Sequence, residues 1–364
     1  MSVIAGESIN ALLGRARRDV DEGVLPSCQL ALACDGEVVA AATFGAPDGS
    51  RYVTFSVTKA FSAGLAWLLI GDAAVSDQTR VAEVVPEFGS NGKHVVTIEH
   101  LLTHTAGFPR APMRPEEGVD RERRLERFAS WRLDWAPGSQ TEYHATSAYW
   151  PLVEVVERVT GSDFRQVFAE RIAAPLGLRG LSLGAAMGQQ NDVMPVCAVG
   201  DATGAAETLG DRLRETGAGF LLRFNEPEVL AAGVPGAGAV ATASDVALYY
   251  QSLLGPDDAV WPRDVVRDAT SNVRNTLVDP LFNHPANRTL GLVVAGDDPL
   301  MRGFGRSVGP RAFGAMGVGG QIAWADPDSG LSFCYLTNGL DADVVGSFQR
   351  AAKLAGLAGR CAAI

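Results

Sequence analysis

The strongest constraint on the fold is that strand-like segments lie near both ends of the chain, with helical patterns between them. Near the start, apolar runs at 28–34 and 37–44 are joined by Asp35-Gly36, a dipeptide favoured in two-residue hairpin turns. Near the end, runs at 321–325 and 331–337 flank a second turn. One antiparallel sheet can collect these segments only if the intervening chain folds as an insertion. We therefore predict an α+β fold whose antiparallel sheet is built from both chain ends and flanked by helices.

The middle of the chain has the apolar spacing of helices and supplies the inserted part. Helical patterns lie at 98–102, 121–128, 147–159, 164–172 and 244–254, and another lies near the end at 343–357. We place the sheet domain at 1–80 and 288–364 and the mainly helical domain at 81–287, with the active site between them. Residues 185–235, rich in glycine, alanine and glutamine, are expected to form an irregular connection along the wall of that site.

Charge and hydropathy narrow the choice of partners. The formal net charge is -11, which disfavours nucleic acid because phosphate binding requires a basic surface. The longest apolar stretch, residues 60–70, is too short to cross a bilayer, so no membrane association is expected. The sequence leaves the oligomeric state open.

Cysteine and histidine usage bears on cofactors and location. Five cysteines without a Cys-x-x-Cys pair suit free thiols, and no secretion signal is visible, so we expect a cytoplasmic protein. His100 and His104 have the spacing of a zinc pair, but Leu101 stands where the glutamate of that motif belongs. We therefore expect no metal and no other cofactor.

The pattern Ser56-x-x-Lys59 is the first candidate for catalysis. Thr54 can begin a helix over 55–70, which places the Ser56 hydroxyl and the Lys59 amine on one helical face. An amine beside a hydroxyl can take its proton, and a backbone N–H in the first turn can stabilise an oxyanion. The same spacing at Ser90 and Lys93 contains Asn-Gly, which favours a turn and separates the two side chains.

Other patterns that could carry chemistry have plainer explanations. The Gly-x-Ser-x-Gly at 305–309 is similar to a nucleophile elbow, but Pro310 follows where a helix should begin, and no histidine comes after His284. The small residues at 236–241 fit a tight turn better than a dinucleotide fingerprint. The alternating charges at 121–127 fit a solvated helix face.

Ser56 and Lys59 belong to a longer series of motifs in a characteristic order. These are Phe-Ser-Val-Thr-Lys at 55–59, Leu-Leu-Thr-His-Thr-Ala-Gly at 101–107, Pro-Gly at 137–138 ahead of Tyr143, Val-Thr-Gly at 159–161, Pro-Leu-Gly-Leu at 175–178, Ala-Thr-Ala-Ser-Asp at 241–245, Gly-Val-Gly-Gly at 317–320 and Leu-Thr-Asn at 336–338. With this series the chain resembles the serine β-lactamase and penicillin-binding-protein superfamily, in particular class C β-lactamases and family VIII carboxylesterases. The resemblance covers most of the chain and implies a β-lactamase-like fold.

The resemblance also implies roles for individual residues. Ser56 would be the acylated nucleophile, Lys59 its proton partner, and Tyr143 the second acid/base group. The backbone N–H groups of Ser56 and Val318 would form the oxyanion hole. The substrate-binding positions of the family fall on His144, Ala145, Ala315, Met316 and Gly317.

Two of these positions depart from the β-lactamase pattern. Ala145 stands where an amide side chain grips the substrate, and Ala315 stands where a lysine or histidine is usual. The first change removes a hydrogen-bond partner and the second removes a cation that would pair with a carboxylate. We therefore expect an esterase-like serine hydrolase that forms an acyl-enzyme with a small neutral ester or amide. An acyltransferase on the same scaffold is the alternative, ahead of a β-lactamase, a D-peptidase or a non-catalytic binding homologue.

Overall fold

The main sheet collects strands from both ends of the chain. The structure is a computed structural model that describes residues 6–200, 218–255 and 259–362. Its six-stranded sheet has the order β2-β1-β12-β11-β10-β9, and all neighbouring strands are antiparallel. The strands are β1 (Cys28–Cys34), β2 (Glu37–Phe44), β9 (Val293–Val294), β10 (Phe313–Gly317), β11 (Gln321–Asp326) and β12 (Leu331–Thr337). The predicted α+β class, with a sheet built from both chain ends, is confirmed.

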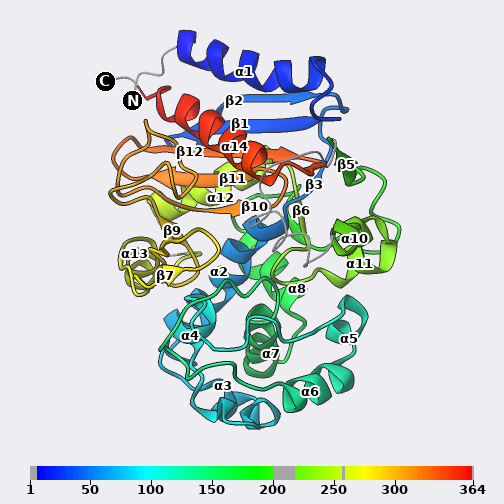
Figure 1. Cartoon of the computed structure of the whole chain (residues 1–364), viewed down its shortest axis with the longest axis vertical. Helices are drawn as coiled ribbons and strands as arrows, with labels where there is room; N and C mark the ends of the chain where they lie inside the picture. Colours follow the sequence, from blue (N-terminus) through cyan, green and yellow to red (C-terminus); the bar gives the residue numbers. More distant parts are fainter. Residues whose placement is uncertain (1–5, 201–217, 256–258, 363–364) are drawn as a thin grey trace.

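Both faces of this sheet are covered by helices. Along β1, Leu30 and Leu32 belong to a hydrophobic cluster on the outer face, whereas Ala31 and Ala33 belong to the larger cluster on the inner face. This alternation follows from the two-residue period of a strand. Helices α1 (Gly6–Asp21) and α14 (Val344–Gly359) pack on the outer face, and α12 (Ala243–Leu254) packs on the inner face (Figure 1).

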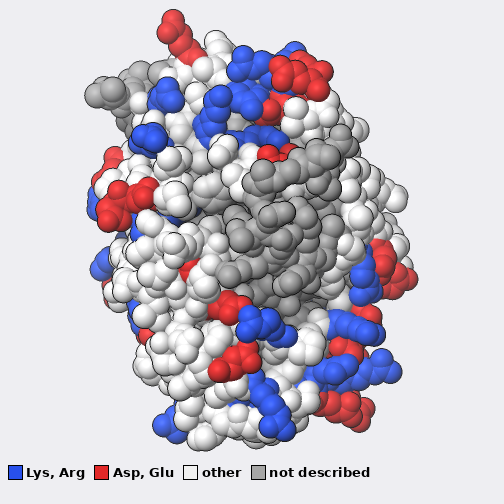
Figure 2. Space-filling model, in the orientation of Figure 1, with Lys and Arg blue, Asp and Glu red and all other residues white. Residues whose placement is uncertain are grey.

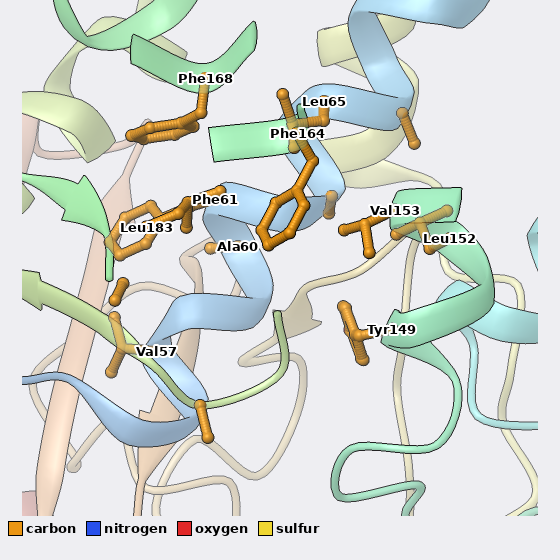
Figure 3. Packing of buried hydrophobic residues seen from close by; sticks show 14 of the residues in the cluster. Val57, Ala60, Phe61, Leu65, Tyr149, Leu152, Val153, Phe164, Phe168 and Leu183 are labelled. Carbon is orange, nitrogen blue, oxygen red and sulfur yellow. The ribbon is translucent and has the colours of Figure 1, made fainter. Parts of the chain in front are cut away.

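Helix α2 (Thr58–Gly71) lies between the sheet and the helical region (Figure 1). Its residues from Thr58 through Leu69 are all buried, so the protein encloses the helix on every side. Figure 3 shows apolar side chains of α2 gathered with those of α7 and α8, and the Phe61 ring lies 6.0 Å from the Phe168 ring, centroid to centroid. This packing fixes the helix from whose N-terminal end the candidate nucleophile extends.

The helical region and the connections around it consist of short elements. The helices are α3 (Val81–Val84), α4 (Ile98–Leu102), α5 (Pro115–Val119), α6 (Arg121–Ser130), α7 (Tyr149–Thr160), α8 (Phe164–Phe168), α10 (Ala218–Leu222), α11 (Pro227–Ala232) and α13 (Arg263–Ser271). The small strands are β3 (Tyr52–Val53), β4 (Ser182–Leu183), β5 (Cys197–Val199), β6 (Ala239–Ala241), β7 (Val278–Asp279), β8 (His284–Pro285) and β13 (Gly339–Asp341). Strand β6 lies between β3 and β4 and thereby ties the segment before α2 to the middle of the chain.

Two local predictions differ from the structure. The charged run at 121–127 is not simply a solvated face, because Arg124 of α6 is buried and forms ion pairs with Glu154 and Glu157 of α7. The connection predicted at 185–235 contains β5, α10 and α11, so its described part is less irregular than expected; residues 201–217 of it lie outside the described residues.

The surface and the cysteines complete the description. On the face in Figure 2, acidic and basic side chains are mixed at the upper and lower ends. Within the described ranges, no helix is both long enough and apolar enough to cross a membrane. All five cysteines carry free thiols.

Candidate active site

Ser56 is presented by a sharp turn between a strand and a helix. The chain leaves β3, forms a single 3₁₀ turn over Phe55–Val57 and continues into α2. Phe55 has φ +42°, a left-handed conformation that is uncommon for a residue with a side chain. The first hydrogen bond of the turn runs from the Val57 N–H to the Thr54 carbonyl, so the Ser56 N–H precedes it.

The helix predicted from Phe55 is present, but its first residues form a 3₁₀ turn and Thr54 does not cap it. The α-helix begins at Thr58, after the 3₁₀ turn, instead of at Phe55. The Thr54 side chain does not cap it; its hydroxyl is bonded to the Thr58 hydroxyl at 3.0 Å and donates to the Ala239 carbonyl of β6. These bonds attach the turn that carries Ser56 to β6.

The Lys59 amine is hydrogen-bonded to the Ser56 hydroxyl. Its Nζ lies 3.1 Å from Ser56 Oγ and donates to the carbonyl oxygens of Ala145 and Gly236, each at 2.7 Å. The residue is only 3% exposed. Burial lowers the pKa of Lys59 below its ordinary value, an effect that the nearby Tyr143 opposes and the Arg288 charge reinforces. The lysine thus lies within hydrogen-bond distance of Ser56, in surroundings that favour its neutral form.

Tyr143 approaches the same hydroxyl from the loop before α7. Its Oη donates to Ser56 Oγ at 2.7 Å, so the serine oxygen lies between the phenol and the amine. The Tyr143 ring stacks on the His104 ring with centroids 4.8 Å apart, and Lys59 Nζ lies 4.8 Å from the Tyr143 centroid. Ser56 and Tyr143 are half-buried, which leaves the oxygen at the surface of the site. The structure thus brings together the three residues predicted to be catalytic.

His144 does not face this site, in contrast to its predicted role in substrate binding. Its side chain is buried; Nε2 accepts from the Phe108 N–H, and Nδ1 is bonded to the Glu142 carbonyl at 2.7 Å. Its backbone N–H donates to His104 Nδ1. Burial lowers the pKa of His144 to about 4 and that of His104 well below its ordinary value. Both rings are neutral supports behind Tyr143, and neither ring nitrogen of His144 is free for a substrate.

The end of β10 runs beside the nucleophile. A methyl group placed on Gly317 would lie 2.8 Å from the Thr54 carbonyl and 3.4 Å from the Ser56 nitrogen, so a side chain there would crowd the turn. Val318 is half-buried and follows directly. This places the backbone of Gly317 next to the Ser56 N–H, and the oxyanion hole made by Ser56 and Val318 stays a prediction.

The remaining predicted substrate positions carry no charged or amide group. Ala145 contributes its carbonyl to Lys59, and Ala315 is half-buried in β10. The Met316 side chain packs against the outer cluster, on the side of the sheet away from α2. The predicted contact through the Met316 side chain is therefore not supported, and only its backbone lies along the strand edge.

Two groups at the site were missed by sequence reasoning. The carbonyl of Gly236 holds Lys59; the turn predicted at 236–241 forms only over its first residues, because Ala239–Ala241 are strand β6. The Arg288 guanidinium carbon lies 5.4 Å from the Tyr143 ring centroid, although no pattern around 287–289 distinguishes this arginine. Such contacts join segments far apart in the chain, so no local spacing reports them.

The alternative motifs do not form comparable pairs. Residues 305–309 form a loop, and the Ser307 carbonyl faces α14 at Gly359. Ser90 and Lys93 lie in a turn, as predicted, where Lys93 Nζ donates to the Ser90 and Trp131 carbonyls. His104 lies beyond the end of α4, so His100 and His104 are not on the same helix. The described residues contain no group of three or more side chains suited to a metal.

Comparisons with known proteins concern the chain as a whole. A family model described as Beta-lactamase matches residues 14–357. The esterase/beta-lactamase LipL of Mycobacterium tuberculosis is 30% identical over 315 residues, which cover 80% of this chain and 70% of LipL.

Solved structures show the same fold. EstA from Arthrobacter nitroguajacolicus Rue61a superposes with a TM-score of 0.79 at 24% identity and covers 99% of both chains. EstCE1, described as a hydrolase with promiscuous acyltransferase activity, gives a TM-score of 0.74 at 21% identity and covers 96% of this chain and 99% of its own. The predicted β-lactamase-like architecture is therefore confirmed.

Proposed function

Because the chain belongs to the beta-lactamase family of serine hydrolases, we propose that it is a carboxylesterase-like enzyme that forms an acyl-enzyme at Ser56. One observation carries the proposal: Ser56 Oγ is hydrogen-bonded to both Lys59 Nζ and Tyr143 Oη. A hydroxyl held between two groups that can exchange its proton is the arrangement that nucleophilic catalysis needs.

The Lys59 contacts suggest how the proton leaves Ser56. A neutral amine has two N–H bonds and one lone pair; the two carbonyls of Ala145 and Gly236 take both N–H bonds, and the lone pair then faces Ser56. As Oγ bonds to the substrate carbonyl carbon, its proton passes to the coupled Lys59–Tyr143 pair. The carbonyl oxygen becomes an oxyanion that the Ser56 and Val318 N–H groups stabilise.

Collapse of this intermediate completes the first half of the reaction. The bond to the leaving oxygen or nitrogen breaks, and Tyr143, whose Oη is hydrogen-bonded to Ser56 Oγ, gives the proton to the leaving group. Water then gives a proton to the same pair, and its oxygen bonds to the acyl carbon. The bond from this carbon to Ser56 Oγ breaks, the acid is released, and the pair returns the proton to Oγ. No group outside the three side chains and two backbone N–H groups is needed.

The substrate we propose is a small neutral ester or amide. Ala145 and Ala315 supply neither the amide nor the ammonium that would grip a β-lactam or a peptide carboxylate. Each such lost hydrogen bond to a charged group costs about 1.5–3 kcal/mol. Acyl transfer to an alcohol or amine is the second candidate, favoured by the similarity to EstCE1. A non-catalytic role is disfavoured by the intact contacts of Ser56.

Turnover of neutral esters and mass detection of the acylated serine test this proposal together. We expect the native protein to hydrolyse p-nitrophenyl butyrate with a higher kcat/KM than nitrocefin, and a covalent adduct at Ser56. Ser56→Ala should abolish both signals, while Ser307→Ala, in the loop at 305–309, should retain them. An adduct on another residue, or activity that survives in Ser56→Ala, would refute the assignment. Addition of an alcohol that yields a new ester would favour the transferase.

A further inference from the structure

Arg288 is a buried cation beside the candidate catalytic tyrosine. The residue is 9% exposed, and its guanidinium carbon lies 5.4 Å from the Tyr143 ring centroid. Its backbone is anchored independently of the side chain: the Arg288 N–H donates to the Asn275 carbonyl, and the Arg288 carbonyl accepts from the Arg274 and Asn275 N–H groups. Backbone hydrogen bonds thus fix the segment of chain that carries this guanidinium.

This charge has no counter-ion within the described ranges of the chain. Arg288 forms no ion pair and no side-chain hydrogen bond with any described residue, and its Nε is buried without a partner. By contrast, the buried Arg124 pairs with Glu154, and the half-buried Arg350 pairs with Asp341. A buried charge without a partner is costly, so its retention calls for a group that becomes negative nearby.

We propose that Arg288 is a positioning residue whose charge favours loss of the first proton from the Lys59–Tyr143 pair and so sets the lower pH limit of catalysis. The inference rests on the proposed function, because it concerns the pair that accepts the proton of Ser56. The fully protonated pair carries one positive charge, and the singly protonated pair is neutral overall wherever the proton resides. A fixed cation therefore disfavours the fully protonated state. If the tyrosine holds the negative charge, it spreads into the ring that faces Arg288.

The other titratable groups around the pair do not compete for this role. They are His104, which stacks on Tyr143; His144, which is bonded to His104; Tyr149 of α7, whose ring lies 5.2 Å from Lys59 Nζ; and Glu142, which pairs with Arg110. Burial keeps both histidines neutral and raises the pKa of Tyr149, so these three carry no charge near neutral pH. Arg288 is then the fixed positive charge that faces the pair.

The proposal also explains how the site functions without a cation at position 315. The β10 strand carries Ala315 in place of the lysine or histidine expected from the family resemblance. Arg288 forms a β-bridge with Val293, and Val293 pairs with Gly314 of β10, so the arginine comes from a segment beside the strand that carries Ala315. A guanidinium in a protein is a permanent cation, so this charge does not depend on the protonation state of its surroundings.

The test compares Arg288→Gln and Arg288→Lys over a range of pH. Two readouts are used: kcat/KM for p-nitrophenyl butyrate, and the rate at which a fluorophosphonate labels Ser56, followed by mass spectrometry. Without the cation, the pH below which both rates decline (the acid limb of each profile) should rise by about one unit. Below this pH both rates should fall roughly tenfold, and at higher pH, where the native rates are constant, they should fall much less. Arg288→Lys, which keeps the charge, should stay near the native profile.

A matched control removes an arginine far more exposed than Arg288. Arg311→Gln deletes the same charge from a side chain that pairs with Asp328 at the surface, and its profile should not move. Equal loss at every pH in Arg288→Gln, with the acid limb in place, would overturn the proposal and indicate a purely structural role. An unmoved limb with loss restricted to esters that bear a carboxylate would also overturn it and make Arg288 a substrate anchor. If the native protein labels at no pH, the proposed function fails, and the inference fails with it.

Discussion

A single methyl group at Gly236 provides a sharp test of how Lys59 is positioned. Gly236 lies in the turn before β6, and its carbonyl is one of the two that hold the Lys59 amine. A Cβ added there would lie 2.7 Å from the Ala145 carbonyl oxygen, 3.3 Å from Thr146 Cα and 3.5 Å from Lys59 Nζ. The Gly236 backbone does not occupy the left-handed region, so Gly236→Ala acts through contact and not through backbone strain.

The size of the effect follows from these distances. To reach ordinary contact, the Ala145 oxygen must withdraw by about 0.7 Å, and both acceptors of Lys59 belong to the segments that are pushed apart. Displacement of a catalytic group by about 1 Å can cost roughly 100-fold in rate. We therefore expect kcat/KM to fall by roughly 10- to 100-fold, and overpacking to lower the free energy of unfolding by about 1–3 kcal/mol.

The assay combines ester kinetics at 25 °C with urea unfolding of the same preparation. Gly14→Ala is the control, because a Cβ on Gly14 in α1 meets nothing within 4 Å. That variant should keep native kinetics and gain stability by about 0.5–1 kcal/mol. Native kinetics in Gly236→Ala would refute the reasoning, since they would show that the lysine does not depend on these two carbonyls. A loss of stability without a loss of rate would refute it equally.

Three further predictions address the catalytic pair and the buried charges. Lys59→Ala and Tyr143→Phe should each lower kcat by roughly 100-fold or more, measured on p-nitrophenyl butyrate, with unchanged circular dichroism. Glu154 is fully buried and binds Arg124, so Glu154→Gln should lower the free energy of unfolding by about 3–5 kcal/mol in urea titrations while kinetics at 25 °C stay native. Burial lowers the pKa of His144 to about 4, so between pH 6.5 and pH 4 the unfolded chain binds a proton that the folded protein excludes. Stability should fall by about 3 kcal/mol as pH drops through this window, and His144→Gln should show a shallower dependence in urea titrations at each pH.

The parts of the fold predicted correctly from sequence are those with strong local periodicity or turn chemistry. The hairpin at Asp35-Gly36 and the final pair of strands have apolar runs bounded by turn residues, and both form as expected. The pairing of Ser56 with Lys59 is equally local, because three residues of helical chain bring them together. In such cases the spacing and the local conformation that the intervening residues favour together determine the contact.

The parts that sequence could not predict depend on contacts between distant segments. Tyr143 entered only through the family resemblance, and it reaches Ser56 across 87 positions of the chain. Arg288 comes from the segment before β9, and its approach to the Tyr143 ring follows from tertiary packing. The charge pattern predicts a solvated face for Arg124, and this is wrong because two glutamates of α7 pair with the arginine and allow its burial. Periodicity cannot report which polar residue finds a buried partner.

The same packing that makes α2 the central helix also sets the chemistry of its first turn. A helix enclosed on all sides needs apolar side chains throughout, and Lys59 is the one charged residue within α2. A carboxylate beside it would fix the lysine as an ammonium, since an ion pair raises the pKa of an amine. Instead Lys59 is bonded to two carbonyls and a hydroxyl, which satisfy its hydrogen bonds without a negative charge. Burial can then lower its pKa, so the enclosure of α2 and the reactivity that we propose for Ser56 have one physical cause.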